Sequence, residues 1–387
     1  MRGVVSEHHD IKVTDEEDSM SARGQTAGNA LRLLLTCVLL AAPVMARAFD
    51  AVLLPEQGPW ARAGEDVRLG LIAAYQTQEA GVADAPELRF FDSSTGDIRA
   101  LYDQVVASGA TLVIGPIEKD KVDALLSDPH RLSVKTLLLN RSSLPAPPQS
   151  WQFSLSPEDE IPALVAAAHH AGLQRVLILY DDDPSDSQRA AQWAQAWRTQ
   201  DGASATEAVI AERQPLLKTL SALLFTSSEQ ATGHGRHRHR HLVLTPRDFD
   251  AVFLACGSRH GSQIHPLLVH LHRDLPVYAL STAIDLQGRI AQRQDLQGVI
   301  YAELPALLLA PADLRLFTAL QATHSSDQRL FALGMDSWTL AQKLASDTPD
   351  WPLAGHTGSI DDVHGQLLRQ PSLSRMAADG PVRWEQP

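Results

Sequence analysis

Short apolar segments alternate with amphipathic ones along this chain, and this alternation restricts the folds that it can adopt. In the first part of the chain the apolar segments lie at 51–54, 88–91, 111–114 and 134–139. Between them, apolar residues recur at intervals of three and four, as they do on one face of a helix. Strands that alternate with helices form parallel sheets covered by helices on both faces. The sequence therefore predicts an α/β fold.

The alternation starts again after NRSSLPAPPQS, a segment rich in Ser and Pro that is typical of a crossover. Ile161, Leu164 and Val165 have helical spacing, and strands are expected at 175–180 and 251–255. Two such runs, joined by one crossover, predict two similar lobes with a cleft between them.

We expect lobe 1 to span residues 49–155 and 302–352, and lobe 2 to span residues 156–301 and 353–387. The ending, LAGHTGSIDDVHGQLLR, has strand-like pieces separated by Gly and Asp, which predicts a closing β-hairpin. In parallel sheets of this kind, ligands bind beyond the carboxyl ends of the strands. The loops at those ends are therefore the candidate walls of the cleft.

The first of these loops lies in DAVLLPEQGPWARAGEDVRLGLIAAY, and it lacks the features of a phosphate-binding loop. Its glycines are Gly58, Gly64 and Gly70, six residues apart, whereas a dinucleotide-binding loop needs G-x-G-x-x-G. A P-loop needs Gly-Lys followed by Ser or Thr, and residues 50–75 contain no Lys. We therefore interpret the loop as part of a cleft wall.

The N-terminus has the features of a secretion signal. Residues 33–42, LLLTCVLLAA, are apolar but too few to span a bilayer, and the small-x-small site ARA follows at 46–48. We predict that residues 1–48 form a signal peptide, that Met20 is the true start, and that the product is exported to the periplasm. Cys37 lacks the small residue that precedes a lipidated cysteine, so a soluble product is favoured, with lipidation as the alternative.

The charge of the chain disfavours one class of partner. The sequence has 33 Lys and Arg against 46 Asp and Glu, a net charge of −13, which disfavours nucleic acid and anionic membranes as direct partners. Removal of the signal peptide leaves Cys256 as the one cysteine, so no internal disulfide is expected.

The tract GHGRHRHRH is a candidate metal site, because neutral imidazoles bind zinc and copper. Arginines alternate with the histidines, however, and their fixed positive charge opposes a bound cation. A solvated loop is therefore favoured over a metal site. The histidines are His234, His237, His239 and His241.

No motif in the sequence argues for catalysis. The nucleophile elbow G-x-S-x-G is absent, and the nearness of Ser258 to His260 in sequence does not define a triad, which depends on spatial geometry. Cys256 ends an apolar strand and is favoured as a buried, inert thiol. Asp181 to Asp183 have the ligand type of a hard cation, but a turn and helix cap are favoured. We predict no catalytic site, no metal site and no cofactor.

Several stretches resemble a known family. VLLPEQGPWARAGEDVRLGLIAAY, LVIGPIEKDKVDALL and KTLLLNR resemble the first lobe of type I periplasmic-binding folds. PRDFDAVFLACGSRHGSQIHPLLVHLHRDLPVYALS and RLFALGMDSWTLAQKL resemble the second lobe and the segments that return from it. Together with GHTGSIDDVHGQLLR, these stretches are similar to the penicillin-binding protein activator family, the LppC-type lipoproteins.

The resemblance implies a regulator that catalyses no reaction. Such proteins sit at the outer membrane and stimulate a class A penicillin-binding protein, which cross-links peptidoglycan. The alternative is a periplasmic solute receptor of an ABC transporter or sensor, with a small molecule such as an amino acid in the cleft. The candidate cleft residues are Gln57, Gly58, Pro59, Trp60, Gly115, Pro116, Asn140, Arg141, Ser142, Asp181 and Ser281.

Two charged residues favour the regulator over the receptor. In transporter-type relatives, hydroxyl groups of the corresponding loops grip the carboxylate of an amino acid. Here Glu118 and Lys119 stand where a Ser or Thr would help to hold such a ligand.

Overall fold

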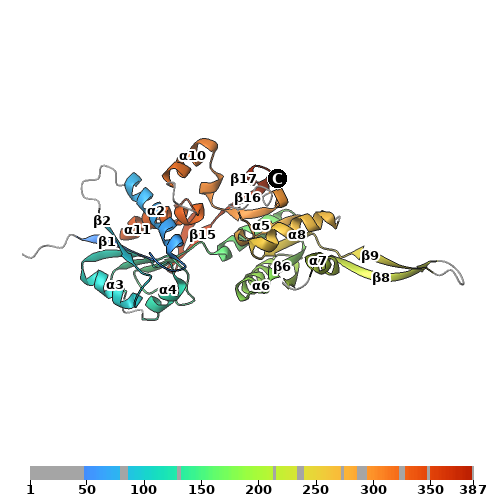
Figure 1. Ribbon diagram of the computed structural model, residues 1–387, viewed down its shortest axis with the longest axis horizontal. Helices are drawn as coiled ribbons and strands as arrows, with labels where there is room; N and C mark the ends of the chain where they lie inside the picture. The colour runs from blue at the N-terminus through green and yellow to red at the C-terminus, as the bar shows by residue number, and fades with distance from the viewer. Residues whose placement is uncertain are drawn as a thin grey trace, which may run out of the picture. The chain divides into compact units, whose positions relative to one another are not determined.

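Strands and helices alternate along the chain and form two large sheets and one two-stranded ribbon (Figure 1). The computed structural model describes residues 48–78, 86–128, 132–211, 215–232, 239–271, 274–285, 294–321, 327–346 and 349–385. Among these residues, no helix combines the length and the apolar character needed to cross a bilayer.

The first sheet has eight strands in the order β13-β14-β15-β5-β4-β3-β1-β2. Its core is parallel from β2 to β5, and β15 pairs in parallel with β5. Strand β14 pairs in the antiparallel direction with both β13 and β15. The strands are β1 (Phe49–Leu54), β2 (Glu87–Asp92), β3 (Ala110–Ile114), β4 (Lys135–Leu138), β5 (Ser150–Phe153), β13 (Leu353–Ala354), β14 (Ser359–Val363) and β15 (Gln366–Gln370).

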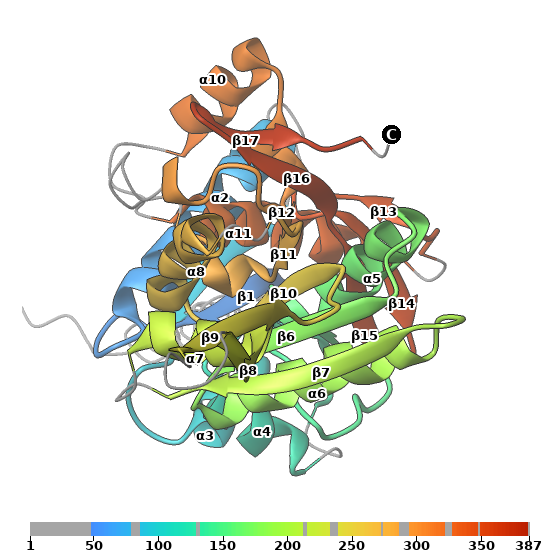
Figure 2. The ribbon, with the colours of Figure 1, turned by 90° about the vertical axis from the view of Figure 1, so that its right-hand side faces the viewer.

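The second sheet has seven strands in the order β17-β16-β12-β11-β10-β6-β7, several of which lie side by side in Figure 2. It is parallel from β7 to β12, and β16 joins β12 in the antiparallel direction. The strands are β6 (Arg175–Asp181), β7 (Ser204–Ile210), β10 (Ala251–Ala255), β11 (Val277–Ala279), β12 (Ile300–Glu303), β16 (Ser372–Ala377) and β17 (Gly380–Arg383).

Helices cover both faces of each sheet, which explains why the central strands are continuously apolar. In the first sheet, Val52 and Leu54 pack against α2 and α11, whereas Ala51 and Leu53 face α3 and α4. In the second sheet, α7 and α8 cover one face, and α5 and α6 cover the other. The helices are α2 (Ala61–Gln78), α3 (Ile98–Ala107), α4 (Lys119–Leu126), α5 (Ile161–His170), α6 (Pro184–Arg198), α7 (Leu216–Leu224), α8 (Ser258–His270), α10 (Pro311–Leu320) and α11 (Gln328–Ala345).

The chain crosses between the two sheets three times. The first crossing joins β5 to α5 through the 3-10 turn η2 (Pro157–Glu160). The second leaves β12 and continues through η5 (Pro305–Leu308) and α10 to α11, which packs on the first sheet. The third joins β15 directly to β16. A turn of the second sheet, η4 (Ser281–Ala283), lies beside the first crossing.

Helices α2 and α11 approach each other closely because glycines lie at their contact. A Cβ atom on Gly334 would lie 2.1 Å from the carbonyl oxygen of Val67, and one on Gly70 would lie 1.9 Å from that of Phe331. No other residue fits at either position without separating the two helices. The glycine in the sequence RLFALGMD thus has a packing role.

The α/β class, the mostly parallel sheets with flanking helices and the closing β-hairpin, formed by β14 and β15, are confirmed. The lobe boundaries stay a prediction, but strand pairing differs from them at one point. The sequence assigns residues 353–387 to lobe 2, whereas β13, β14 and β15 pair within the first sheet and only β16 and β17 join the second. The third crossing therefore lies after Gln370, because β15 pairs with β5.

The antiparallel ribbon of β8 (Phe225–Thr232) and β9 (His239–Pro246) was absent from the sequence-based prediction; it projects beyond α7 (Figure 1). Residues 239–241 belong to β9 and not to the loop that the sequence predicts. The proposed start at Met20, the signal region up to residue 47, Cys37, His234 and His237 lie outside the described residues.

The α2–α11 contact yields a stability prediction. Gly334→Ala should lower the free energy of unfolding by about 1–3 kcal/mol, because the added methyl group overpacks the contact with Val67. Urea denaturation would measure this loss. A stable Gly334→Ala protein would contradict the assigned packing role.

Candidate functional site

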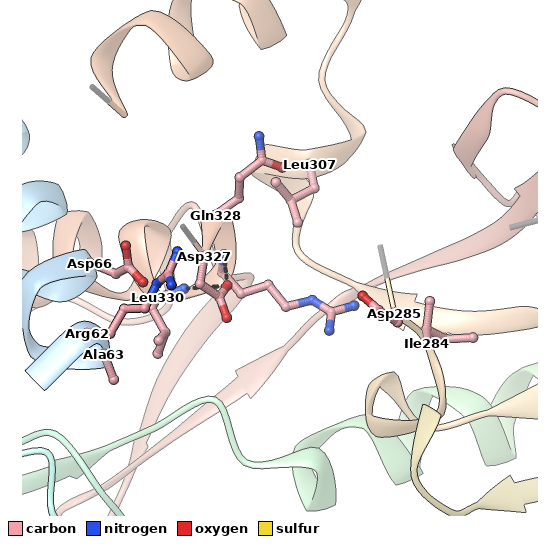
Figure 3. Close-up of a pocket in the computed structure, with 10 residues that line it drawn as sticks. Arg62, Ala63, Asp66, Ile284, Asp285, Leu307, Asp327, Gln328 and Leu330 are labelled. Carbon is pink, nitrogen blue, oxygen red and sulfur yellow. Dashed lines mark hydrogen bonds between the residues drawn. The ribbon is translucent and has the colours of Figure 1, made fainter. Parts of the chain in front are cut away.

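The loops at the carboxyl ends of both sheets surround a cleft made of three neighbouring hollows. The hollows have volumes of about 720, 540 and 220 Å³. All three are lined by Leu330, in the first turn of α11, so this helix end stands between them. Figure 3 shows the hollow of 540 Å³, with Ile284 and Asp285 on one side and Asp66 and Gln328 on the other.

The hollow of 720 Å³ has an apolar side and a polar side. Trp60, which is 51% exposed, and Leu330 contribute to its apolar lining. Three cationic side chains also line it, namely Lys119, Arg141 and Arg189, against one carboxylate, Glu158. Each of these cations is paired with a carboxylate: Lys119 with Asp123, Arg141 with Asp159, and Arg189 with Glu158 and Asp186.

The hollow of 220 Å³ is lined by a network of charged side chains. The guanidinium of Arg329 binds the carboxylate of Glu303 through two bonds, Nη2–Oε2 at 2.7 Å and Nε–Oε1 at 3.1 Å. Its Nη1 donates to the carbonyl of Ser281 at 3.5 Å. Glu303 ends β12 and is 1% exposed, and its partly exposed partner Arg329 links α11, which packs on the first sheet, to the second sheet.

Glu160 is the second carboxylate of the network and is 4% exposed. It accepts hydrogen bonds from Ser281, from the backbone N–H at 2.7 Å and from Oγ at 2.5 Å. Burial, which opposes the charged form, raises the pKa of Glu160 to about 7, although the Ser281 hydrogen bonds and the charges of Arg369 and Arg329 act in the other direction. This carboxyl therefore titrates near neutral pH.

Arg369 and Arg141 complete the network at the first crossing. Arg369 is 4% exposed and donates to the carbonyls of Ser154 and Ser156, at 3.0 and 3.3 Å. Arg141 binds Asp159 through two bonds of 2.8 and 3.1 Å, and the same carboxylate lies 3.8 Å from Arg369 Nε. Buried ion pairs of this kind need such additional hydrogen bonds to offset desolvation.

The sequence pointed to only some of these residues. Four of the candidate cleft residues, Trp60, Asn140, Arg141 and Ser142, line the hollow of 720 Å³. Ser281 lines the hollow of 220 Å³. The structure therefore brings the loops after β1 and β4 together with the end of β11.

The other candidates do not line these hollows. The Nε2 of Gln57 lies 3.5 Å from Asp92, and Gly115 packs on the carbonyl of Leu53. Gly58, Pro59 and Pro116 are likewise not part of the lining. Asp181 accepts from the N–H of Gly257 at 2.9 Å and pairs with Nδ1 of His260 at 2.6 Å.

Glu118 does not stand where the sequence places it. It is 3% exposed and accepts hydrogen bonds from Ser93 Oγ at 3.1 Å and from Lys121 Nζ at 2.9 Å. Lys119, its neighbour, does line the hollow of 720 Å³. Because successive residues at a helix start point in different directions, only one of the pair can face the cleft.

The sequence analysis missed Glu160, Glu303, Arg329 and Arg369. The available signal was a lone charge beside an apolar strand, as in Glu303 after GVIYA and Arg369 within QLLRQ. Such a charge is buried only if a partner from elsewhere in the chain meets it, and local sequence does not contain that partner.

Among the residues that the sequence offers as candidates for catalysis or metal binding, Cys256 is buried and His260 is bonded to a neighbouring residue. Cys256 is fully buried, and burial raises the pKa of its thiol well above its ordinary value, which favours the unreactive form. Nδ1 of His260 is engaged by Asp181. Within the part of the chain that the structure describes, no group of three or more His, Cys, Asp or Glu is placed to hold a metal ion.

Comparison with known sequences gives one family. The model of the family described as "LppC putative lipoprotein" matches residues 39–366. A penicillin-binding protein activator LpoA from Pectobacterium parmentieri is 26% identical over 323 residues, which make up 74% of this chain and 46% of that protein. The chain thus spans less than half the length of this curated relative.

Comparison with solved structures identifies the fold. The LpoA C-domain from Haemophilus influenzae, a regulator of PBP1A, has a TM-score of 0.69 at 20% identity, over 87% of this chain and 99% of that one. An R. palustris ABC-transporter solute-binding protein in complex with 4-hydroxybenzoate has a TM-score of 0.60 at 11% identity, over 88% of this chain and 98% of that one. The predicted similarity to type I periplasmic-binding folds is confirmed.

The carboxyl of Glu160 yields a pH prediction. Its pKa in the folded chain, about 7, lies above the ordinary value of 4.5, so between these values the folded state holds a proton that the unfolded state has released. Stability should therefore fall as pH rises from 5 to 8. Relative to Glu160→Gln, the wild type should lose roughly 3 kcal/mol over this range.

Urea denaturation of both proteins across this pH range measures the difference. Glu160→Gln keeps a group that can accept from Ser281 but does not titrate, so it removes this one contribution and leaves the other carboxyls unchanged. Parallel pH curves for the two proteins would contradict the assignment.

Proposed function

This chain belongs to the LppC family, and we propose that it is a regulator that activates a class A penicillin-binding protein in peptidoglycan synthesis. The observation that carries the proposal is the similarity to penicillin-binding protein activators over most of the chain, joined to a fold that covers 99% of the C-domain of a regulator of PBP1A. The fold alone would not distinguish a regulator from a receptor.

We further propose that this regulator acts by contact and not by catalysis. The buried thiol of Cys256 supports this, because burial keeps it in the unreactive form and away from any substrate. The leader-like sequence before Ala48 supports export to the periplasm, where such a synthase has its catalytic domains. Lipidation of Cys37 would place the regulator at the outer membrane.

A small-molecule receptor is the second candidate, and one observation favours it. Ser154 Oγ and Arg141 Nε are buried and have no hydrogen-bond partner among the residues that the structure describes. Both residues line the hollow of 720 Å³, a volume typical of small-molecule sites. Buried donors without partners are destabilising by about 1–3 kcal/mol, which a ligand oxygen would offset.

The regulator is tested with purified class A penicillin-binding proteins of the source organism. The chain should bind one of them and raise the rate of peptide cross-linking several-fold in a synthesis assay. Ser258→Ala should stimulate as strongly as wild type, because contact does not depend on that hydroxyl. Neither binding nor stimulation at micromolar concentrations would overturn the proposal, and loss of stimulation in Ser258→Ala would contradict its non-catalytic part.

The receptor is tested by a thermal-shift titration with the standard amino acids. If the receptor is correct, one of them should raise the melting temperature by several degrees. Ser154→Ala should weaken that binding about tenfold, the loss of one strong hydrogen bond, without lowering the stability of the free chain. Ser228→Ala, at an exposed position of β8, is the matched control. No shift with any amino acid would remove this candidate and leave the regulator untouched.

A further inference from the structure

The charges that meet between the two sheets are sorted by the side from which they come. The guanidiniums belong to the first sheet: one follows β4, one lies in β15 and one opens α11. The carboxylates belong to the elements that enter or end the second sheet: two precede α5 and one ends β12. The guanidiniums are Arg141, Arg369 and Arg329, and the carboxylates are Asp159, Glu160 and Glu303.

Each of the three crossings passes through this network. The first carries Asp159 and Glu160, the second begins at Glu303, and the third begins just after Arg369. A rotation of one sheet against the other must change the torsion angles of these same segments, because they are the covalent links between the sheets. The ion pairs therefore lie where such a rotation would have to occur.

The contacts across the boundary are short, and their carboxylates are buried, whereas the side chains of Arg329 and Arg141 are 23% and 21% exposed. Arg329 and Glu303 are joined by bonds of 2.7 and 3.1 Å, with Glu303 1% exposed. Arg141 holds Asp159 at 2.8 and 3.1 Å. Any opening of the boundary must break several charge-assisted bonds together or hydrate all six groups, so intermediate arrangements are unfavourable.

We propose that these six side chains form a latch that holds the two sheets in one orientation, and that the latch is released when Glu160 gives up its proton and becomes hydrated. The proposal goes beyond activation of a synthase and does not depend on it. It assigns the chain two states, latched and released, that differ in the angle between the sheets.

The direction of the pH effect follows from the surroundings of Glu160. Arg329 from α11, Arg369 from β15, Glu303 from β12 and Asp327 before α11 line the same hollow. Burial among them raises the pKa of Glu160 to about 7, whereas a hydrated carboxyl has a value near 4.5. Between these two values the latched state therefore holds a proton that the released state has lost, so rising pH favours release up to about pH 7.

The distance between two spin labels, one on each side, measures the latch. Asp120→Cys in α4 and Gln195→Cys in α6 are exposed sites, and Cys256 is fully buried and escapes labelling. Every labelled protein also carries Cys37→Ser, so that this cysteine cannot take up the label. At pH 5 the distance distribution should have one narrow maximum, and the ratio of released to latched chains should rise by up to about tenfold for each pH unit until about pH 7 and level off above it.

Three variants distinguish the latch from a general loss of stability. Arg329→Met with Glu303→Leu replaces a buried ion pair by apolar groups, which keeps the chain folded but removes the main bond across the boundary. It should broaden the distribution at every pH. Arg198→Met with Glu207→Leu, a pair within the second sheet's layer, is the matched control and should behave as wild type. Glu160→Gln should abolish the pH dependence.

The proposal is overturned if the wild-type distribution does not change between pH 5 and 8, or if the Arg329 and Glu303 double variant stays as narrow as wild type. It is also overturned if the Arg198 and Glu207 control broadens equally, because the effect would then reflect any lost ion pair. Urea denaturation of each labelled protein confirms that the measured chains are folded.

Discussion

The orientation of the two sheets depends on a balance of buried charge. Three guanidiniums meet two carboxylates and the protonated carboxyl of Glu160 where the chain passes from one sheet to the other. Removing one partner from a buried ion pair costs about 3–5 kcal/mol because the other charge stays buried. Apolar packing stabilises each sheet separately, since each has its own core on both faces. The charges add what apolar packing lacks, a directional contact between the two halves.

Helix α11 connects this network to the rest of the molecule. Its body packs on α2 through Gly334, and its first turn carries Arg329 to Glu303. Further along, the carboxylate of Asp336 accepts from the N–H groups of His356 and Thr357, at 2.8 and 2.7 Å, and so holds the turn before the closing hairpin. The sequence RLFALGMD therefore combines a latch residue, a close helix contact and a turn anchor in one helix.

The same fold supports different activities, and the cleft explains how. The R. palustris relative in fold binds 4-hydroxybenzoate, whereas the Haemophilus relative in fold is a regulator. In this chain most polar groups of the cleft loops are bonded to one another, as Asn140 is to the carbonyl of Ile117 and the N–H of Ser142 is to Gln152. Two donors of the hollow of 720 Å³, Ser154 Oγ and Arg141 Nε, have no hydrogen-bond partner among the described residues.

The sequence by itself determined what depends on near neighbours: the alternation of strands and helices, the closing hairpin, and the loops of Trp60, Asn140, Arg141 and Ser142 that reach the cleft. It did not place β13 to β15 in the first sheet, because that pairing joins residues far apart in the chain. Which charged side chains are buried, and with which partners, is determined only by the tertiary structure. Arg369 finds its acceptor at Ser154, 215 residues away, and no local pattern encodes such a partner. The spacing of apolar residues indicates which face of a helix or strand is buried. A charged side chain, by contrast, is buried only where an element from elsewhere in the chain places an oppositely charged partner beside it.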